Sequence, residues 1–81
     1  MTITVHFYSY FKDLTGCAQA SEAVPPGSAL GELHKQLMTR FPKLKQMEKS
    51  TLIAVGLEYQ PRDYVLKEGE EVSLFPPVQG G

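Results

Sequence analysis

The C-terminus holds the residues best suited to chemistry, Pro76-Pro77-Val78-Gln79-Gly80-Gly81. Proline fixes the backbone angle φ and has no N–H group, so the proline pair prevents this segment from pairing with a β-sheet. In the extended form that proline prefers, residues 76–81 reach roughly 15–20 Å. Glycine has no side chain, so the last two residues fit a narrow channel. The pattern predicts a tail that presents a terminal carboxylate to another protein.

A carboxylate on Gly81 reacts only after activation, because a carboxylate is a poor electrophile. Adenylation by ATP gives a mixed anhydride, which a sulfur nucleophile attacks to leave a thiocarboxylate or a thioester. The unbranched glycine leaves this attack unhindered. Such a mechanism needs no catalytic group in the carrier itself. The simpler interpretation is a frayed chain end, but the rigid Pro-Pro spacer favours a carrier.

Elsewhere the chain offers few groups for catalysis or metal binding. Its single cysteine, Cys17, cannot form an internal disulfide, and a zinc site needs several ligands. Its two histidines, His6 and His34, fall in a strand pattern and a helix pattern and match no metal-binding spacing. We therefore predict no metal site and no bound cofactor, and a structural or incidental role for Cys17.

Composition indicates one small globular domain, since the 81 residues are 42% hydrophobic and 21% charged. The formal net charge of −1 and the lack of a basic block argue against nucleic acid as a partner. The apolar runs are far shorter than the ~20 residues of a membrane span, and residues 1–5 do not resemble a signal peptide. We expect a cytoplasmic protein without a membrane partner.

The first part of the chain predicts two strands separated by a loop. Residues 2–8 alternate between apolar and polar side chains, which is typical of a half-buried strand with Ile3, Val5 and Phe7 facing inward. Residues 9–16 are expected to form a loop. Residues 18–24 predict a weaker strand that ends at Pro25 and has on one side Ala18, Ala20 and Val24.

One helix is predicted next. Ser28 is a suitable N-cap, and an apolar stripe follows at helical spacing, formed by Leu30, Leu33, Leu37 and Phe41. Pro42 disfavours helical geometry at the residue before it, so the helix ends near Phe41. Residues 43–50 are expected to form a charged connector above Leu44 and Met47.

The remaining apolar runs predict strands at residues 51–55, 57–59 and 71–75, the last with Val72 and Leu74 facing inward. Strands around a single helix indicate an α+β fold, with a mixed sheet of four to five strands and the helix packed on one face. This order permits a β-grasp sheet without requiring it. The expected domain is residues 1–75, followed by a flexible tail at residues 76–81.

The C-terminal stretch also resembles a known family. Residues 63–81 are similar to the C-terminal signature of the MoaD family, the ubiquitin-like sulfur carriers that form the small subunit of molybdopterin synthase. The specific part is the run Phe75-Pro76-Pro77-Val78-x-Gly80-Gly81 after an acidic turn at residues 68–72. The chain departs from the family at Gly56, where Asn is frequent, and at Tyr10-Phe11, which is bulkier than the usual loop.

The resemblance implies a β-grasp fold and a two-stage role. An E1-like (MoeB-like) enzyme would adenylate the Gly81 carboxylate with ATP, and a persulfide sulfur donor would convert it to a thiocarboxylate. The tail, with Pro76, Pro77, Val78 and Gly80, would then enter the large (MoaE-like) subunit and give sulfur to cyclic pyranopterin monophosphate in molybdenum cofactor biosynthesis. The family's synthase is a heterotetramer whose large subunit holds the acid–base groups. The chain itself would be no enzyme on its own.

Strand alternation also predicts a docking surface. If Phe7 and Leu74 face inward, then Tyr8 and Phe75 face outward, and Tyr59 lies just before a turn where it could join them. Outward aromatic residues of a small sheet suggest a partner contact, and these positions match hydrophobic contact sites of the family. The alternative is that they are scattered surface aromatics.

Three other functions remain open. The chain could carry sulfur for thiamine or another thiolated product, or it could be a ubiquitin-like modifier of protein lysines. It could also be an interaction module with an inert Gly-Gly end. The Phe-Pro-Pro-Val run before Gly-Gly favours the molybdopterin branch.

Overall fold

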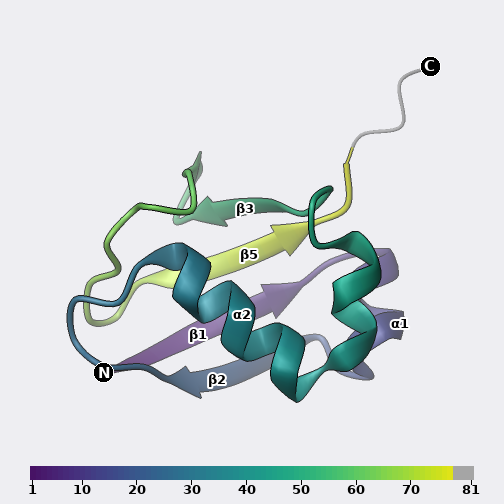
Figure 1. The fold of residues 1–81 in the computed structure, drawn as a ribbon, viewed down its shortest axis with the longest axis horizontal. Helices are drawn as coiled ribbons and strands as arrows, with labels where there is room; N and C mark the ends of the chain where they lie inside the picture. The colour runs from purple at the N-terminus through teal and green to yellow at the C-terminus, as the bar shows by residue number, and fades with distance from the viewer. Residues whose placement is uncertain (78–81) are drawn as a thin grey trace.

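The computed structural model describes residues 1–77, which form a five-stranded sheet, one main helix and two shorter helical segments (Figure 1). In chain order the elements are β1 (Thr2–Phe7), α1 (Tyr10–Thr15), β2 (Gln19–Ala23), α2 (Leu30–Arg40), the 3₁₀ helix η1 (Pro42–Met47), β3 (Leu52–Val55), β4 (Glu58–Tyr59) and β5 (Glu71–Phe75). None of the helices in this part of the chain is long and apolar enough to cross a membrane.

The sheet has the strand order β2-β1-β5-β3-β4. β1 and β5 run parallel at its centre, and the other neighbouring strands are antiparallel. α2 crosses one face of the sheet and leaves the other face uncovered (Figure 1). The predicted α+β class, the mixed sheet and the single main helix are confirmed, and the fold is the ubiquitin-like β-grasp.

The core lies between α2 and the sheet face that it covers. Side chains of β1 and β5 point into this layer at every second residue, as expected from the period of a strand. All the inward residues predicted for these two strands are buried, namely Ile3, Val5, Phe7, Val72 and Leu74. The buried residues of α2 face them, chiefly Leu30, Leu33, Leu37 and Met38. This packing fixes which residues of β1 and β5 are left on the outer face.

Residues 10–15 form helix α1, so the prediction of a loop there is wrong. α1 buries Phe11 completely, which makes this bulky residue part of the core. Gly16 ends the helix with a φ of 78° and donates its N–H to the Lys12 carbonyl at 2.8 Å. A left-handed residue at this position favours glycine. The helix is too short for a periodic apolar pattern, which is why the sequence did not reveal it.

The start of α2 also differs from the prediction. The N-cap is Ala29 and not Ser28. The Ser28 hydroxyl instead donates to the Pro25 carbonyl at 2.6 Å. The helix ends at Arg40, close to the position predicted from Pro42.

Backbone carbonyls from the segment between β4 and β5 replace the side-chain cap. The N–H groups of Leu30 and Gly31 donate to the carbonyls of Tyr64 and Arg62 at 2.7 and 2.8 Å. The first N–H groups of a helix need such external acceptors. The two backbones lie so close that a Cβ on Gly31 would be 3.2 Å from the Arg62 carbonyl oxygen. This segment is therefore held against α2.

The second strand has a buried charge that the sequence did not predict. Of the residues predicted on one side of this strand, Ala20 and Val24 are buried, whereas Ala18 is exposed and lies before the strand. Glu22 is the other inward residue of β2. Gln36 donates to Glu22 at 2.9 Å, and Arg40 forms an ion pair with it. These two partners from α2 compensate the burial of a carboxylate.

The connector after α2 contains η1, with Leu44 buried and Met47 half-buried as predicted. The later strands agree with the prediction to within one residue at each end.

Candidate functional site

The three aromatic residues predicted to face outward come together on the sheet face opposite α2. Ala54 pairs with both Ser73 and Tyr59, so β3, β4 and β5 place Tyr59 on the same face as Ser73 and Phe75. The Phe75 ring stacks on the Tyr8 ring, with centroids 4.9 Å apart and planes 5° apart. It meets the Tyr59 ring edge-on at 6.1 Å. We call Tyr8, Tyr59 and Phe75 the aromatic patch.

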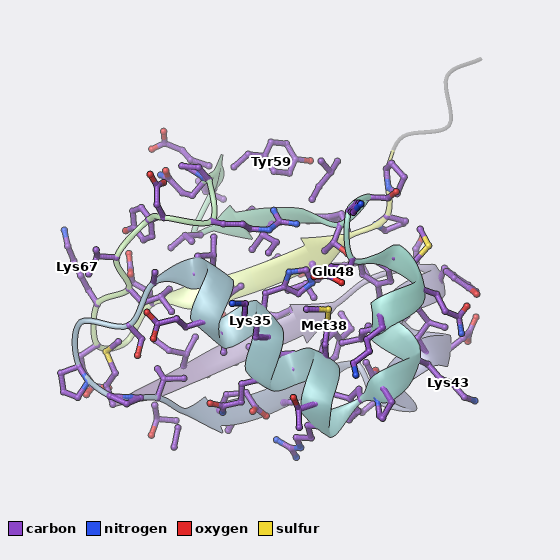
Figure 2. The ribbon with its side chains drawn as sticks, viewed as in Figure 1. Lys35, Met38, Lys43, Glu48, Tyr59 and Lys67 are labelled. Atoms are coloured by element: carbon purple, nitrogen blue, oxygen red, sulfur yellow. The ribbon has the colours of Figure 1, made fainter. Side chains whose placement is uncertain are left out.

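The aromatic patch is exposed. Tyr8 and Tyr59 expose 43% and 64% of their surface, and Phe75 is half-buried between them. Tyr59 projects from the β3–β4 edge of the sheet, away from α2 (Figure 2). Contiguous exposed apolar surface is typical of protein contacts, and aromatic residues dominate the centres of such contacts.

The tail leaves the sheet at this patch. β5 ends at Phe75, and Pro76 and Pro77 follow with half-buried side chains. The Tyr8 N–H donates to the Leu74 carbonyl at 3.4 Å, which holds the end of β1 beside the end of β5. A protein that covers the patch therefore lies next to the start of the tail. The other predicted tail residues lie outside the described residues: Val78, Gly80 and Gly81.

A shallow hollow adjoins the patch on the same face. It has a volume of about 320 Å³, and its lining consists of His6, Tyr8, Gly56, Leu57, Glu71 and Ser73. We call it the outer-face hollow. Within it, His6 Nε2 lies 2.7 Å from Glu71 Oε1. Tyr8 belongs both to this hollow and to the aromatic patch, so the two form one continuous surface.

Leu57 was not among the predicted site residues, yet its side chain is fully exposed. It follows Gly56, whose φ of 63° turns the chain between β3 and β4. Both glycine and asparagine adopt this left-handed conformation readily, so Gly56 keeps the turn expected where the MoaD family often has Asn. An apolar residue directly after a turn glycine is the sequence signal that marks Leu57.

A second hollow lies on the other side of the molecule, between α2 and the residues that precede β3. Its volume is about 540 Å³, and Lys35, Met38 and Glu48 are among its lining residues (Figure 2). His34 also lines it but is only 4% exposed, and no described residue hydrogen-bonds to its Nε2. Burial lowers the pKa of His34, the Arg62 charge lowers it further, and Glu48 acts in the opposite direction. His34 is therefore a neutral core histidine near pH 7.

Neither a metal centre nor an activated thiol is found in residues 1–77. No group of three or more His, Cys, Asp or Glu side chains in this range could hold a metal ion. Cys17 is half-buried, and its Sγ lies 3.7 Å from Thr15 Oγ1. A cysteine nucleophile needs a base at hydrogen-bond distance, which threonine does not provide. The arrangement is an exposed aromatic patch beside the residues that follow β5.

Curated proteins include relatives that align over nearly the whole chain. The molybdopterin synthase sulfur carrier subunit of Chlamydomonas reinhardtii is 29% identical over 83 residues, which cover 100% of both chains. The human protein of the same name is 28% identical over 82 residues, which cover 98% of this chain and 93% of the relative. The resemblance predicted from the C-terminal signature is confirmed.

Solved structures extend the comparison. The complex of subunits 1 and 2 of the molybdopterin-converting factor from Helicobacter pylori includes a chain with 26% identity and a TM-score of 0.73, with 100% of both chains covered. SAMP1 from Haloferax volcanii shares the fold, with a TM-score of 0.90 at 18% identity and 100% of both chains covered. Residues 5–81 match the family model of the ThiS family. Because this match spans nearly the whole sequence, the chain belongs to the ThiS family.

Proposed function

We propose that this chain is the sulfur-carrier subunit of a molybdopterin synthase and works in the cytoplasm. The position of the aromatic patch supports this most, because Pro76 and Pro77 leave β5 directly beside it. A partner that binds the patch is thereby placed to receive the tail. Relatives that align over nearly the whole chain carry this name.

The chemistry takes place on the Gly81 carboxylate. An E1-like enzyme binds ATP and joins AMP to this carboxylate, with release of pyrophosphate. The sulfur of a persulfide donor displaces AMP, and a thiol then cleaves the S–S bond. The products are a thiocarboxylate on Gly81 and a disulfide on the donor. In the large subunit, thiocarboxylates from two loaded chains each give one sulfur to cyclic pyranopterin monophosphate, and hydrolysis returns each Gly81 to a carboxylate.

The residues of this chain bind and position, and the partners supply the catalysis. Phe75, Tyr8 and Tyr59 hold the large subunit against the outer face. Pro76 and Pro77 direct the tail away from the sheet, and Val78 and Gly80 pass with it into the partner. The chain needs no cofactor of its own, since ATP is bound by the activating enzyme. In the assembled heterotetramer the small subunits lie at the outer ends of a large-subunit dimer.

Reconstitution with the large subunit from the same organism tests this function. The chain is loaded with sulfur by its activating enzyme, ATP and a persulfide donor, then mixed with the large subunit and cyclic pyranopterin monophosphate. We expect a stable complex and formation of the dithiolene product. A loaded chain that neither binds the large subunit nor sulfurates the pterin would contradict the proposal. Conjugates on protein lysines, or sulfur in another product, would indicate one of the other carrier functions.

A further inference from the structure

The outer-face hollow combines an acidic, an aromatic and an aliphatic wall. Glu71 supplies the carboxylate, with 66% of its side chain exposed. Tyr8 supplies a ring, and Leu57 supplies an apolar side chain that touches little else in the described chain. The lining includes no lysine or arginine. A ligand that satisfies all three walls needs a positive charge, a flat or polarisable head and an apolar stem.

The walls of the hollow are held in place by the sheet. The Gly56 N–H donates to the Glu71 carbonyl at 2.9 Å, which ties the turn that carries Leu57 to the first residue of β5. Glu71 also pairs with Thr4 of the neighbouring β1. The hollow is therefore preformed, and binding there requires little ordering of the backbone.

When a partner buries the aromatic patch, the neighbouring Glu71 carboxylate requires a positively charged group to pair with it. Tyr8 lines both surfaces, so a partner that covers Tyr8 and Phe75 also removes water from the neighbourhood of Glu71. A buried carboxylate loses its hydration, and this cost is offset only when a positive group pairs with it. Within residues 1–77, Glu71 Oε1 is hydrogen-bonded to His6, and Oε2 has no partner.

We propose that the outer-face hollow receives a positively charged side chain of the large subunit, with arginine as the best fit. This inference rests on the proposed function. The guanidinium of the arginine pairs with Glu71 and lies against the Tyr8 ring, since arginine both forms bidentate hydrogen bonds to carboxylates and stacks on aromatic faces. Its aliphatic stem packs on Leu57. The hollow thus adds a charged contact beside the apolar one and sets the orientation of the partner on the patch.

Glu71→Gln tests this contact, because it removes the charge and keeps the shape of the side chain. We expect the affinity for the large subunit to fall by at least about tenfold and to depend less steeply on salt, with an unchanged thermal midpoint. Glu58→Gln is the matched control. This substitution removes the same charge from the neighbouring β3–β4 hairpin, but Glu58 pairs with Val55 and so lies on the opposite face of the sheet from Glu71. We expect this control to bind as the wild type does.

Two results would overturn the inference. One is a Glu71→Gln affinity equal to that of the wild type. The other is a salt dependence of binding that is as steep in Glu71→Gln as in the wild type, since Glu71 would then not be the group that pairs with a cation of the partner. Failure of the proposed function looks different: the wild type itself would not bind the large subunit, and the inference would fall with it.

Discussion

At the scale of single residues, Phe75 is the centre of the aromatic patch, because its ring contacts both Tyr8 and Tyr59. Phe75→Ala should therefore weaken binding to the large subunit by about 2 kcal/mol or more, which is over an order of magnitude in affinity. The fold should remain, since the ring lies on the outer face. Titration calorimetry and a thermal melt measure the two effects.

Tyr10→Ala is the control for Phe75→Ala, since Tyr10 is an exposed aromatic on α1 and lies outside the patch. It should leave the affinity unchanged. An equal loss in both variants, or unfolding of Phe75→Ala, would show that the outer-face assignment of Phe75 is wrong.

His34 predicts a dependence of stability on pH. Its pKa in the folded chain lies below the ordinary value of 6.5 because the ring is buried. Near pH 6.5, His34 therefore takes up a proton in the unfolded chain but not in the folded chain. The free energy of unfolding consequently falls as the pH drops through this range. Urea unfolding at about pH 7.5 and about pH 5.5 should show a larger loss in the wild type than in His34→Leu. Equal losses would mean that His34 is not the group responsible.

Substitutions of Gly56 test the conformation of the turn that carries Leu57. No heavy atom lies within 4 Å of a Cβ built at this position, so a substitution changes only the cost of its positive φ. Gly56→Ala should lower the free energy of unfolding by roughly 1–2 kcal/mol. Gly56→Asn should cost less, because asparagine tolerates the left-handed region. A loss in Gly56→Asn as large as in Gly56→Ala would show that the turn is held by something other than its backbone conformation.

At the scale of elements, the register of β5 decides which face each of its residues occupies. Leu74 is buried, and Leu57 on the neighbouring turn is fully exposed. Leu74→Ala should cost roughly 2–5 kcal/mol of stability as a core truncation, whereas Leu57→Ala, the same chemical change, should cost almost nothing. Urea unfolding of the two variants makes the comparison. A Leu74→Ala midpoint equal to that of the wild type would mean that β5 is out of register by one residue.

The elements that could be predicted from the sequence are those whose signal is local. Alternation over residues 2–8 and 71–75 identified β1 and β5 with their inward residues, and the apolar stripe with Pro42 identified α2. The start of α2 could not be predicted, because its acceptors are the carbonyls of Arg62 and Tyr64, more than thirty residues away in the chain. The burial of Glu22 likewise depends on partners from another element.

At the scale of the whole molecule, some residues of the candidate site follow from local sequence patterns, whereas others are brought together only by the folded sheet. Tyr8 and Phe75 follow from alternation alone, since each comes directly after an inward residue. Their contact with Tyr59 needs the pairing of β3 with β4 and β5, which only the folded sheet shows. The outer-face hollow needs in addition the docking of the Gly56 turn on β5. No local pattern contains this information.

The fold separates two tasks between the two faces of the sheet. The face under α2 buries the core (Figure 1). The outer face presents the aromatic patch and the outer-face hollow, beside the residues that follow β5. This separation suits the proposed carrier function, because partners that bind the outer face would lie beside the start of the segment that ends in Gly81.

The intact mass of the chain after loading tests the central claim, that Gly81 carries the sulfur. With the activating enzyme, ATP and a persulfide donor, the wild type should gain a species in which one oxygen is replaced by sulfur. A variant without Gly81 should not, although it should still bind the large subunit. Its carboxylate is withdrawn by roughly 3 Å, and misplacements of about 1 Å already cost up to 100-fold in rate. A wild-type mass that does not change, or equal loading of the deletion variant, would contradict the account.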